Sequence, residues 1–187
     1  MLLQLKIQIE GISKPPVWRK VLVPDHFTFE RLHQVIQAAF GWSDSHCYAF
    51  SPAGYGSVPQ IGVPDEGGWM DTEILDSSKI KISKILTTKG MTFSYVYDFG
   101  DDWVHSLQLE DVTDEKAIRA TLVSGKGACP PEDCGGVWGY DNLVDAVNNT
   151  YHPEHDDMRN WMGMDEGETW DKSSFDLHKA QKEVAAV

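Results

Sequence analysis

The sequence predicts an α+β fold: a mainly antiparallel sheet built from hairpins, one clear amphipathic helix near residues 28–40, and several short C-terminal helices. Apolar and polar residues alternate in short segments separated by turn residues, which is typical of strands. Only a few helical patterns are interspersed among them. Pairing mainly by hairpins favours this class over a parallel doubly wound sheet.

Two strands open the chain. Residues 2–10 alternate apolar and polar side chains, the pattern of a half-buried strand. Gly11 and the pair Pro15 and Pro16 interrupt the chain before the apolar run of residues 17–23. These two segments predict an antiparallel pair.

The helix follows, because Thr28 can cap its start and Gly41 can take the left-handed conformation that ends a helix. Between them apolar residues recur at steps of three and four: Leu32, Val35, Ile36, Ala39 and Phe40. Residues 46–50 then predict a strand. One of its faces would carry His46, Tyr48 and Phe50.

The middle of the chain combines a loop and a hairpin. Residues 51–68 contain five Gly and three Pro, so we expect a long surface loop, either a lid or binding loop or an insertion without a role. A weak helix or strand is expected near residues 80–86. The strongest hairpin signal spans residues 92–110, and Gly100 in its turn is expected to take a positive φ.

The last third begins with a short strand near residues 120–124, which leads into a Gly, Cys and Pro loop ending near Tyr140. Helices are predicted at residues 141–148, 153–162 and 174–184. The length of 187 residues predicts a single domain, with two tightly packed lobes as the alternative.

Charge is unevenly distributed along this chain of net charge −13. Nine acidic and nine basic residues precede Tyr97, whereas 20 acidic and seven basic residues follow it. An acidic surface repels phosphate backbones, so we do not expect nucleic-acid binding. The acids are either a solvated surface or a site for a cation or a basic partner.

Compartment is indicated by three features. No stretch approaches the roughly 18 to 20 uncharged apolar residues of a membrane span. The first residues alternate instead of forming the apolar block of a signal peptide. Three cysteines, an odd number, form no dense disulfide framework. We therefore expect a soluble cytoplasmic protein with no membrane partner.

The hairpin turn is the first candidate site. Asp98, Asp101 and Asp102 lie close in sequence to His105, and such carboxylates repel each other unless a cation, a basic side chain or backbone amides compensate them. A metal or cationic-ligand site is one interpretation. The other is that Asp98 and Asp101 accept hydrogen bonds from turn amides while Trp103 packs.

The loop from Cys129 to Tyr140 is the second candidate. Cys129 and Cys134 could bind zinc with His46 or His105, although only one cysteine pair exists. A redox pair and a rigid Pro/Gly loop are the alternatives. The sequence contains no catalytic motif of a common enzyme class: it has no Gly-x-Ser-x-Gly elbow, phosphate-binding loop or His-Glu-x-x-His segment.

Four ordered motifs resemble one family: Pro16-Val17-Trp18-Arg19, Leu32-His33 through Phe40-Gly41-Trp42-Ser43-Asp44-Ser45-His46-Cys47-Tyr48-Ala49-Phe50, Tyr97-Asp98-Phe99-Gly100-Asp101-Asp102-Trp103-Val104-His105, and Cys129-Pro130-Pro131-Glu132-Asp133-Cys134-Gly135-Gly136 with Gly139-Tyr140. The chain resembles the Ri-plasmid ORF-three-like family. This resemblance implies an α+β domain and a mobile-element context, in which some relatives carry the label of transposon resolvase. It implies no established activity. A serine recombinase needs an arginine cluster and a basic DNA-binding element, and only four scattered arginines exist here.

The leading hypothesis is therefore a binding or protein-interaction module whose site joins the Asp98–His105 turn and the Cys129–Tyr140 loop, with a basic protein or a small ligand as its partner. The candidate binding residues are Trp42, His46, Tyr48, Tyr97, Asp98, Asp101, Asp102, Trp103, His105, Glu132, Asp133 and Tyr140. The alternative is a metal-dependent hydrolase with Glu132 or Asp133 as general base and ligands from Asp98, Asp101, Asp102, His46 and His105. A resolvase accessory role is disfavoured by the charge. No cofactor is expected beyond a divalent metal.

Overall fold

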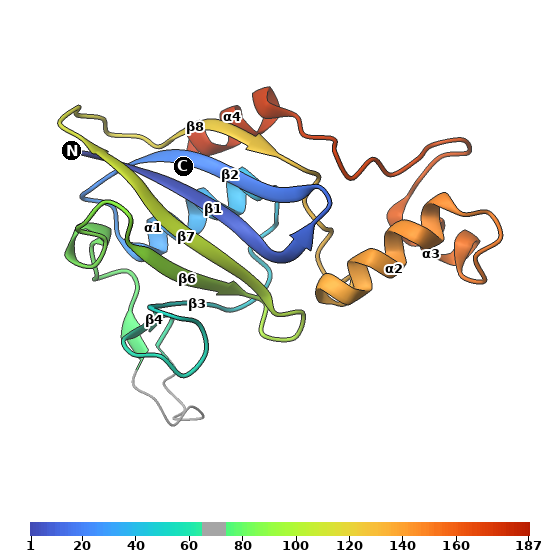
Figure 1. Cartoon of the computed structure of the whole chain (residues 1–187), viewed down its shortest axis with the longest axis horizontal. Helices are drawn as coiled ribbons and strands as arrows, with labels where there is room; N and C mark the ends of the chain where they lie inside the picture. The colour runs from blue at the N-terminus through green and yellow to red at the C-terminus, as the bar shows by residue number, and fades with distance from the viewer. Residues whose placement is uncertain (65–73) are drawn as a thin grey trace.

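The computed structural model describes residues 1–64 and 74–187, and there it shows four helices and one eight-stranded sheet (Figure 1). The strand order is β5-β4-β3-β6-β7-β1-β2-β8, and every pair is antiparallel except β4 with β5. The α+β prediction is confirmed. The elements are β1 Leu2–Ser13, β2 Pro16–Pro24, α1 Phe29–Phe40, β3 Tyr48–Ser51, β4 Gln60–Gly62, β5 Ile74–Asp76, the 3-10 helix η1 Ile82–Lys84, β6 Thr92–Tyr97, β7 Trp103–Thr113, β8 Thr121–Lys126, α2 Gly136–Asn148, α3 His155–Met162 and α4 Leu177–Ala186.

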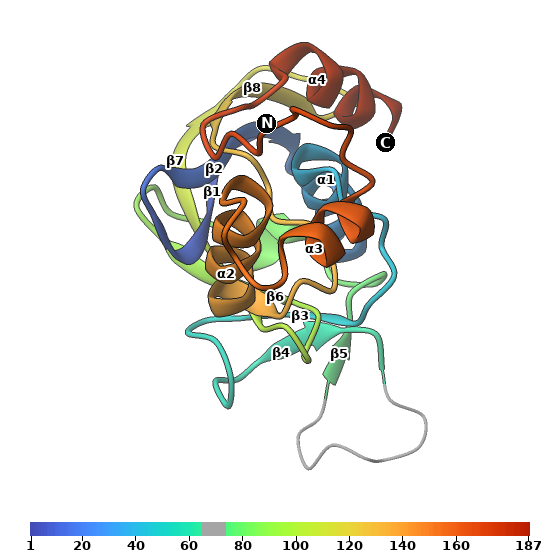
Figure 2. The same cartoon turned by 90° about the vertical axis from the view of Figure 1, so that its right-hand side faces the viewer.

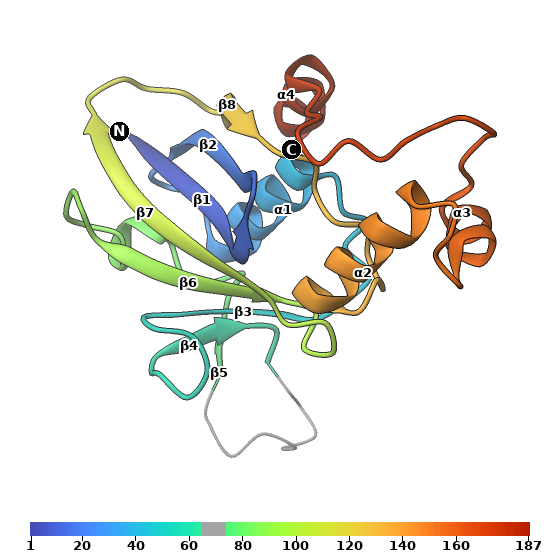
Figure 3. The ribbon, with the colours of Figure 1, turned by 45° about the vertical axis from the view of Figure 1, so that its right-hand side comes forward.

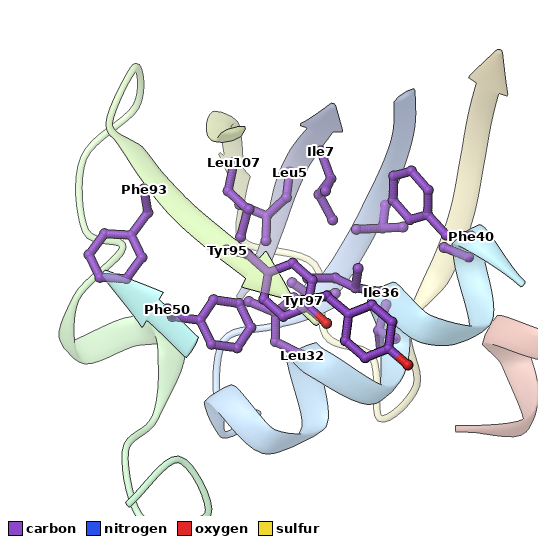
Figure 4. Packing of buried hydrophobic residues seen from close by; sticks show 14 of the residues in the cluster. Leu5, Ile7, Leu32, Ile36, Phe40, Phe50, Phe93, Tyr95, Tyr97 and Leu107 are labelled. Atoms are coloured by element: carbon purple, nitrogen blue, oxygen red, sulfur yellow. The ribbon is translucent and has the colours of Figure 1, made fainter. Parts of the chain in front are cut away.

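The core lies between the sheet and α1. Alternating side chains of β1 and β6 face this helix, and Figure 4 shows Tyr95 and Tyr97 extending over Leu32 and Ile36. The predicted caps are confirmed: the Thr28 hydroxyl accepts a hydrogen bond from the first turn, and Gly41 ends the helix at φ 87°. Burial of this apolar stripe, more than helix propensity, stabilises α1.

Arg19 of β2 is a buried cation that ties several segments together. Its guanidinium donates four hydrogen bonds to backbone carbonyls, at 2.9 to 3.1 Å, and these belong to Trp18, Ala39, Lys126 and Gly127. Ala39 lies in the last turn of α1, where carbonyls have no partner within the helix and a positive charge is favourable. The sheet thus supplies the basic group that the helix end lacks.

Two aromatic rings enclose the same guanidinium. Its central carbon lies 3.8 Å from the ring centre of Phe175 and 4.9 Å from that of Phe40. A Cβ on Gly125 would stand 2.6 Å from the Phe175 ring, so glycine makes room for the stack. Burial lowers the pKa of Arg19 to about 10, which leaves it charged at neutral pH.

The remaining helices lie at one end and one edge of the sheet. α2 and α3 extend beyond the strands, and the β6–β7 turn lies at the start of α2 (Figures 1 and 3). α4 lies beside β8 and α1 (Figure 2). In the described part of the chain no helix is long and apolar enough to cross a membrane.

Three local predictions need correction. Gly100 does not take a positive φ; Asp98 and Asp102 do, at 57° and 55°. Asp98 tolerates this region because its side chain bonds the local backbone. The predicted 51–68 loop contains the short strand β4, whose pairing with β3 overrides its Gly content, while residues 65–68 lie outside the described residues. The Cys129–Tyr140 loop ends early because α2 begins at Gly136.

Candidate functional site

The β6–β7 turn is in direct contact with the segment that precedes α2. The Asp101 carboxylate accepts a hydrogen bond of 3.0 Å from the backbone N–H of Gly135. A Cβ on Gly136 would stand 2.3 Å from the carbonyl oxygen of Asp101, so this close approach requires glycine. The two segments that the sequence assigned to one site therefore meet.

Glu132 attaches the loop to two further elements. Its carboxylate accepts hydrogen bonds from the backbone N–H of Ser43 at 3.0 Å, from the hydroxyl of Ser43, and from the hydroxyl of Tyr97. Burial disfavours the charged carboxylate, but these donors outweigh burial and hold the pKa of Glu132 below its usual value. Burial and the neighbouring carboxylate raise the pKa of Tyr97, so the phenol stays protonated and donates a hydrogen bond to Glu132.

The imidazole of His46 lies between carboxylates from the two segments. Its Nε2 atom is 3.2 Å from Asp133 Oδ1 and 3.6 Å from Asp98 Oδ2. This Nε2 atom is buried, yet it makes no hydrogen bond of acceptable geometry. Among the described residues, these three form the one group of three metal-ligating side chains whose ligand atoms all lie within 4.8 Å of one another. Such an arrangement can hold a cation.

Further carboxylate oxygens of the turn accept hydrogen bonds from groups other than His46. Asp98 Oδ1 accepts from the N–H groups of Gly100 at 2.9 Å and Asp101 at 3.3 Å, as expected for a turn. Asp102 accepts from the hydroxyl of Tyr55. Asp101 accepts its hydrogen bond from Gly135 of the loop instead of from turn amides. Neither Asp101 nor Asp102 belongs to the His46 group.

Trp42 joins the site to the core. Its indole Nε1 donates to the carbonyl of Pro130 at 3.0 Å, and its ring stacks on Tyr97 with centroids 5.0 Å apart. Trp42 is buried, so it orders the loop and offers little surface to a ligand.

Like Trp42 and Tyr97, four further candidate residues are buried in the fold and do not belong to the His46 group: Tyr48, Trp103, His105 and Tyr140. The His105 Nδ1 donates to the carbonyl of Trp103 at 2.8 Å, and burial lowers the pKa of His105 to about 4 although this hydrogen bond opposes the change. A neutral, buried imidazole cannot join the turn carboxylates. The ligand set of the hydrolase hypothesis is thus brought together only in part.

The two loop thiols are also separate from this group. Cys129 and Cys134 are free cysteines. Burial raises the pKa of both thiols, that of Cys134 to about 12, with the nearby Asp101 adding to the effect there. Thiolates are the forms that bind zinc and exchange disulfides, so this environment favours the rigid-loop interpretation.

A buried polar network escaped the sequence analysis. The Tyr95 hydroxyl lies 3.0 Å from the amide of Gln37, which donates to it, and 2.8 Å from His33 Nδ1, while His33 Nε2 lies 2.7 Å from Asp44. Burial lowers the pKa of His33 although Asp44 opposes this. The signal that could have revealed the network was two polar residues, four apart, on the apolar face of α1.

Comparison with known proteins identifies the family of this chain. The profile of the family described as "Plasmid pRiA4b ORF-3-like protein" matches residues 1–179. The chain belongs to the plasmid pRiA4b ORF-3-like family. An uncharacterised relative of this kind from Sinorhizobium fredii, y4hQ, is 35% identical over 185 residues, which are 98% of this chain and 92% of that protein.

A crystal structure shows the same fold. A protein of unknown function from Methanosarcina mazei Go1 superimposes with a TM-score of 0.77 and is 32% identical, covering 95% of this chain and 96% of the other. Membership of the plasmid pRiA4b ORF-3-like family confirms the resemblance seen in the four motifs. Because both relatives are described without a function, the site itself must carry any functional argument.

Proposed function

We propose that this chain is a cytoplasmic protein-interaction module that binds a basic partner through an acidic, aromatic surface formed by the loop before α2, α2 itself and α3. The carrying observation is charge: residues 131–168 contain ten Asp and Glu residues and a single basic residue, Arg159. Complementary charge steers a basic protein to such a surface and disfavours acidic competitors.

The single basic residue does not neutralise this surface. The Arg159 guanidinium donates to the backbone carbonyls of Val147 at 3.1 Å, of Glu168 at 2.8 Å and of Asp165. Its charge is therefore used to hold the segment after α3 onto α2. Some neighbouring carboxylates are used within the fold, as Asp141 is by Lys172 at 2.7 Å, but exposed ones such as Asp156 and Asp157 remain available to a partner.

Two adjoining cavities lie in this surface. One, of about 290 Å³, is lined by Asp133, Leu143, Glu154, Met158 and Trp161. The other, of about 440 Å³, is lined by Trp42, Glu132, Met162 and Trp170, and Trp161 is common to both. Apolar walls with carboxylates nearby suit a lysine or arginine side chain, whose stem packs while its charged end is paired.

Aromatic side chains on the same surface are exposed to solvent. Trp138 is 87% exposed, Tyr151 95% and Trp161 51%. Aromatic residues of this kind supply much of the binding free energy at protein interfaces. Their presence beside the acidic side chains supports recognition of a protein over a small ion alone.

The experiment is fluorescence anisotropy with a labelled lysine-rich peptide containing one tryptophan, at about 0.15 M salt and with a chelator present. We expect saturable binding that weakens at least tenfold in Glu154→Gln and in Trp161→Ala. Glu115→Gln removes another exposed charge, from the β7–β8 loop, and should bind as the parent does. Equal weakening in all three variants, or no binding at all, would overturn the proposal.

A hydrolase receives less support from the geometry. Glu132, one of its two predicted bases, already accepts three hydrogen bonds and has a lowered pKa, both of which make a carboxylate a poor proton acceptor.

Two further inferences accompany the proposed interaction function. Three cysteines that form no disulfide with one another fit the cytoplasm. Leu5, Tyr140 and Val184 share one core, which supports a single domain over residues 1–187.

A further inference from the structure

We propose that His46, Asp98 and Asp133 form a binding site for one divalent transition-metal ion. Donor atoms about 2.1 Å from a Zn²⁺ ion stand about 3.0 to 3.5 Å from each other. The separation from His46 Nε2 to Asp133 is 3.2 Å, within this range, and that to Asp98 is 3.6 Å, slightly longer, while all three ligand atoms lie within 4.8 Å of one another. The inference does not depend on a basic partner.

Hydrogen bonds from the turn hold the Asp98 carboxylate in a fixed position near His46. Asp98 is 8% exposed, and its Oδ1 atom is fixed by the amides of Gly100 and Asp101, while Oδ2 is the atom near His46. The backbone N–H of Asp98 donates to the carbonyl of Cys47 at 2.9 Å, which ties the turn to the residue after His46. Two ligands from distant parts of the chain are thereby held in fixed relation before any ion arrives.

The Nε2 atom of this imidazole, on a side chain that is 27% exposed, provides a further indication. His46 Nε2 is buried without a hydrogen bond of acceptable geometry, although polar atoms that are buried normally have a partner. An ion coordinated by that nitrogen and by both carboxylates would satisfy all three groups at once. It would also neutralise the charge of two carboxylates facing each other across the imidazole.

The donor set indicates the class of ion. One imidazole and two carboxylates carry a charge of −2 when His46 is neutral, which balances a divalent ion. Imidazole suits Zn²⁺, Mn²⁺ and Fe²⁺ better than Mg²⁺ or Ca²⁺, which prefer oxygen ligands. Asp133 is 69% exposed on its side chain, so solvent and a further ligand can reach the open coordination positions.

The test uses the full chain without a tag, stripped with a chelator, dialysed and titrated with Zn²⁺ or Mn²⁺ alone. We expect one equivalent to bind, with at least tenfold weaker binding in His46→Gln and in Asp133→Asn, and a Mg²⁺ affinity at least tenfold lower. The d–d absorption of bound Co²⁺ should change in the same two variants. His26→Gln and Asp114→Asn remove an exposed imidazole and an exposed carboxylate elsewhere and should leave binding unchanged.

Three results would overturn the inference. Less than a tenth of an equivalent of Zn²⁺ or Mn²⁺ would show that His46 is simply an ion-pair partner of the two carboxylates. Binding that survives His46→Gln and Asp133→Asn would place the ion elsewhere. Loss of binding in Cys47→Ser would assign it to the exposed thiol next to His46.

Discussion

Replacing Arg19 with methionine should destabilise the protein without any change at the surface. The substitution keeps an unbranched side chain about as long as the stem of arginine but removes four hydrogen bonds from a charged donor to backbone carbonyls. At about 1.5 to 3 kcal/mol for each such bond, the gross loss is about 6 to 12 kcal/mol.

Two effects offset much of that loss. The variant no longer desolvates a cation, which returns several kcal/mol. Water can also enter the cavity of about 430 Å³ that Arg19 and Phe175 help to line, and there it can hydrate the freed carbonyls. We therefore expect Arg19→Met to lower the free energy of unfolding by about 3 kcal/mol. Arg19→Lys keeps the charge, but one ammonium cannot reach four carbonyls on three segments, so its cost should be about 2 kcal/mol.

Urea unfolding followed by tryptophan fluorescence measures these differences. Arg119→Met is the control, because Arg119 is exposed and donates one long hydrogen bond of 3.3 Å, and its effect should stay within about 0.5 kcal/mol. The reasoning fails if Arg19→Met costs less than about 1 kcal/mol, or no more than the control.

Three more predictions follow from the fold and the charge. His105 binds a proton in the unfolded chain at its ordinary pKa of 6.5 but in the folded chain only near pH 4, so its contribution to stability is complete above pH 6.5 and is lost as the pH falls towards 4. At about 1.4 kcal/mol per pH unit this amounts to at most about 3.5 kcal/mol, and His105→Gln should flatten the decline in unfolding free energy; an unchanged pH profile contradicts the assignment. Gly136→Ala places a Cβ 2.3 Å from the Asp101 carbonyl oxygen and should cost about 2 kcal/mol or more, whereas Gly163→Ala, with a similar positive φ but open space, should cost about 1 kcal/mol; equal costs in urea unfolding would show that the close approach is unimportant. Duplex DNA should produce no anisotropy change at about 0.15 M salt, and micromolar binding would refute the argument from charge.

The sequence sufficed for elements whose signals are local. The α1 helix from Thr28 to Gly41 and the β6–β7 hairpin were predicted because periodicity and caps act within a few residues. The conformation of the turn was not: glycine is the usual residue at positive φ, but here Asp98 takes that role through its own side-chain hydrogen bonds.

Candidate residues of the site were predicted less well because their roles depend on long-range packing. The convergence of turn and loop was anticipated from composition, and Asp98 does meet Asp133 through His46. Strand alternation places His105 on the buried face of Leu107 and Leu109, but it could not show that His46, just before β3, would stay partly exposed beside Asp133. The anchoring role of Arg19 was also hidden, because its carbonyl partners lie up to 108 residues away.

Asp133 belongs to two surfaces at once, because its carboxylate lies 3.2 Å from His46 Nε2 and also lines the cavity between α2 and α3. A cation held on one surface withdraws that charge from the other. Metal ion and basic partner would then be antagonists, and linkage requires each to weaken the binding of the other by the same factor. A rise in free metal would release the partner, and a scarcity of metal would favour its capture.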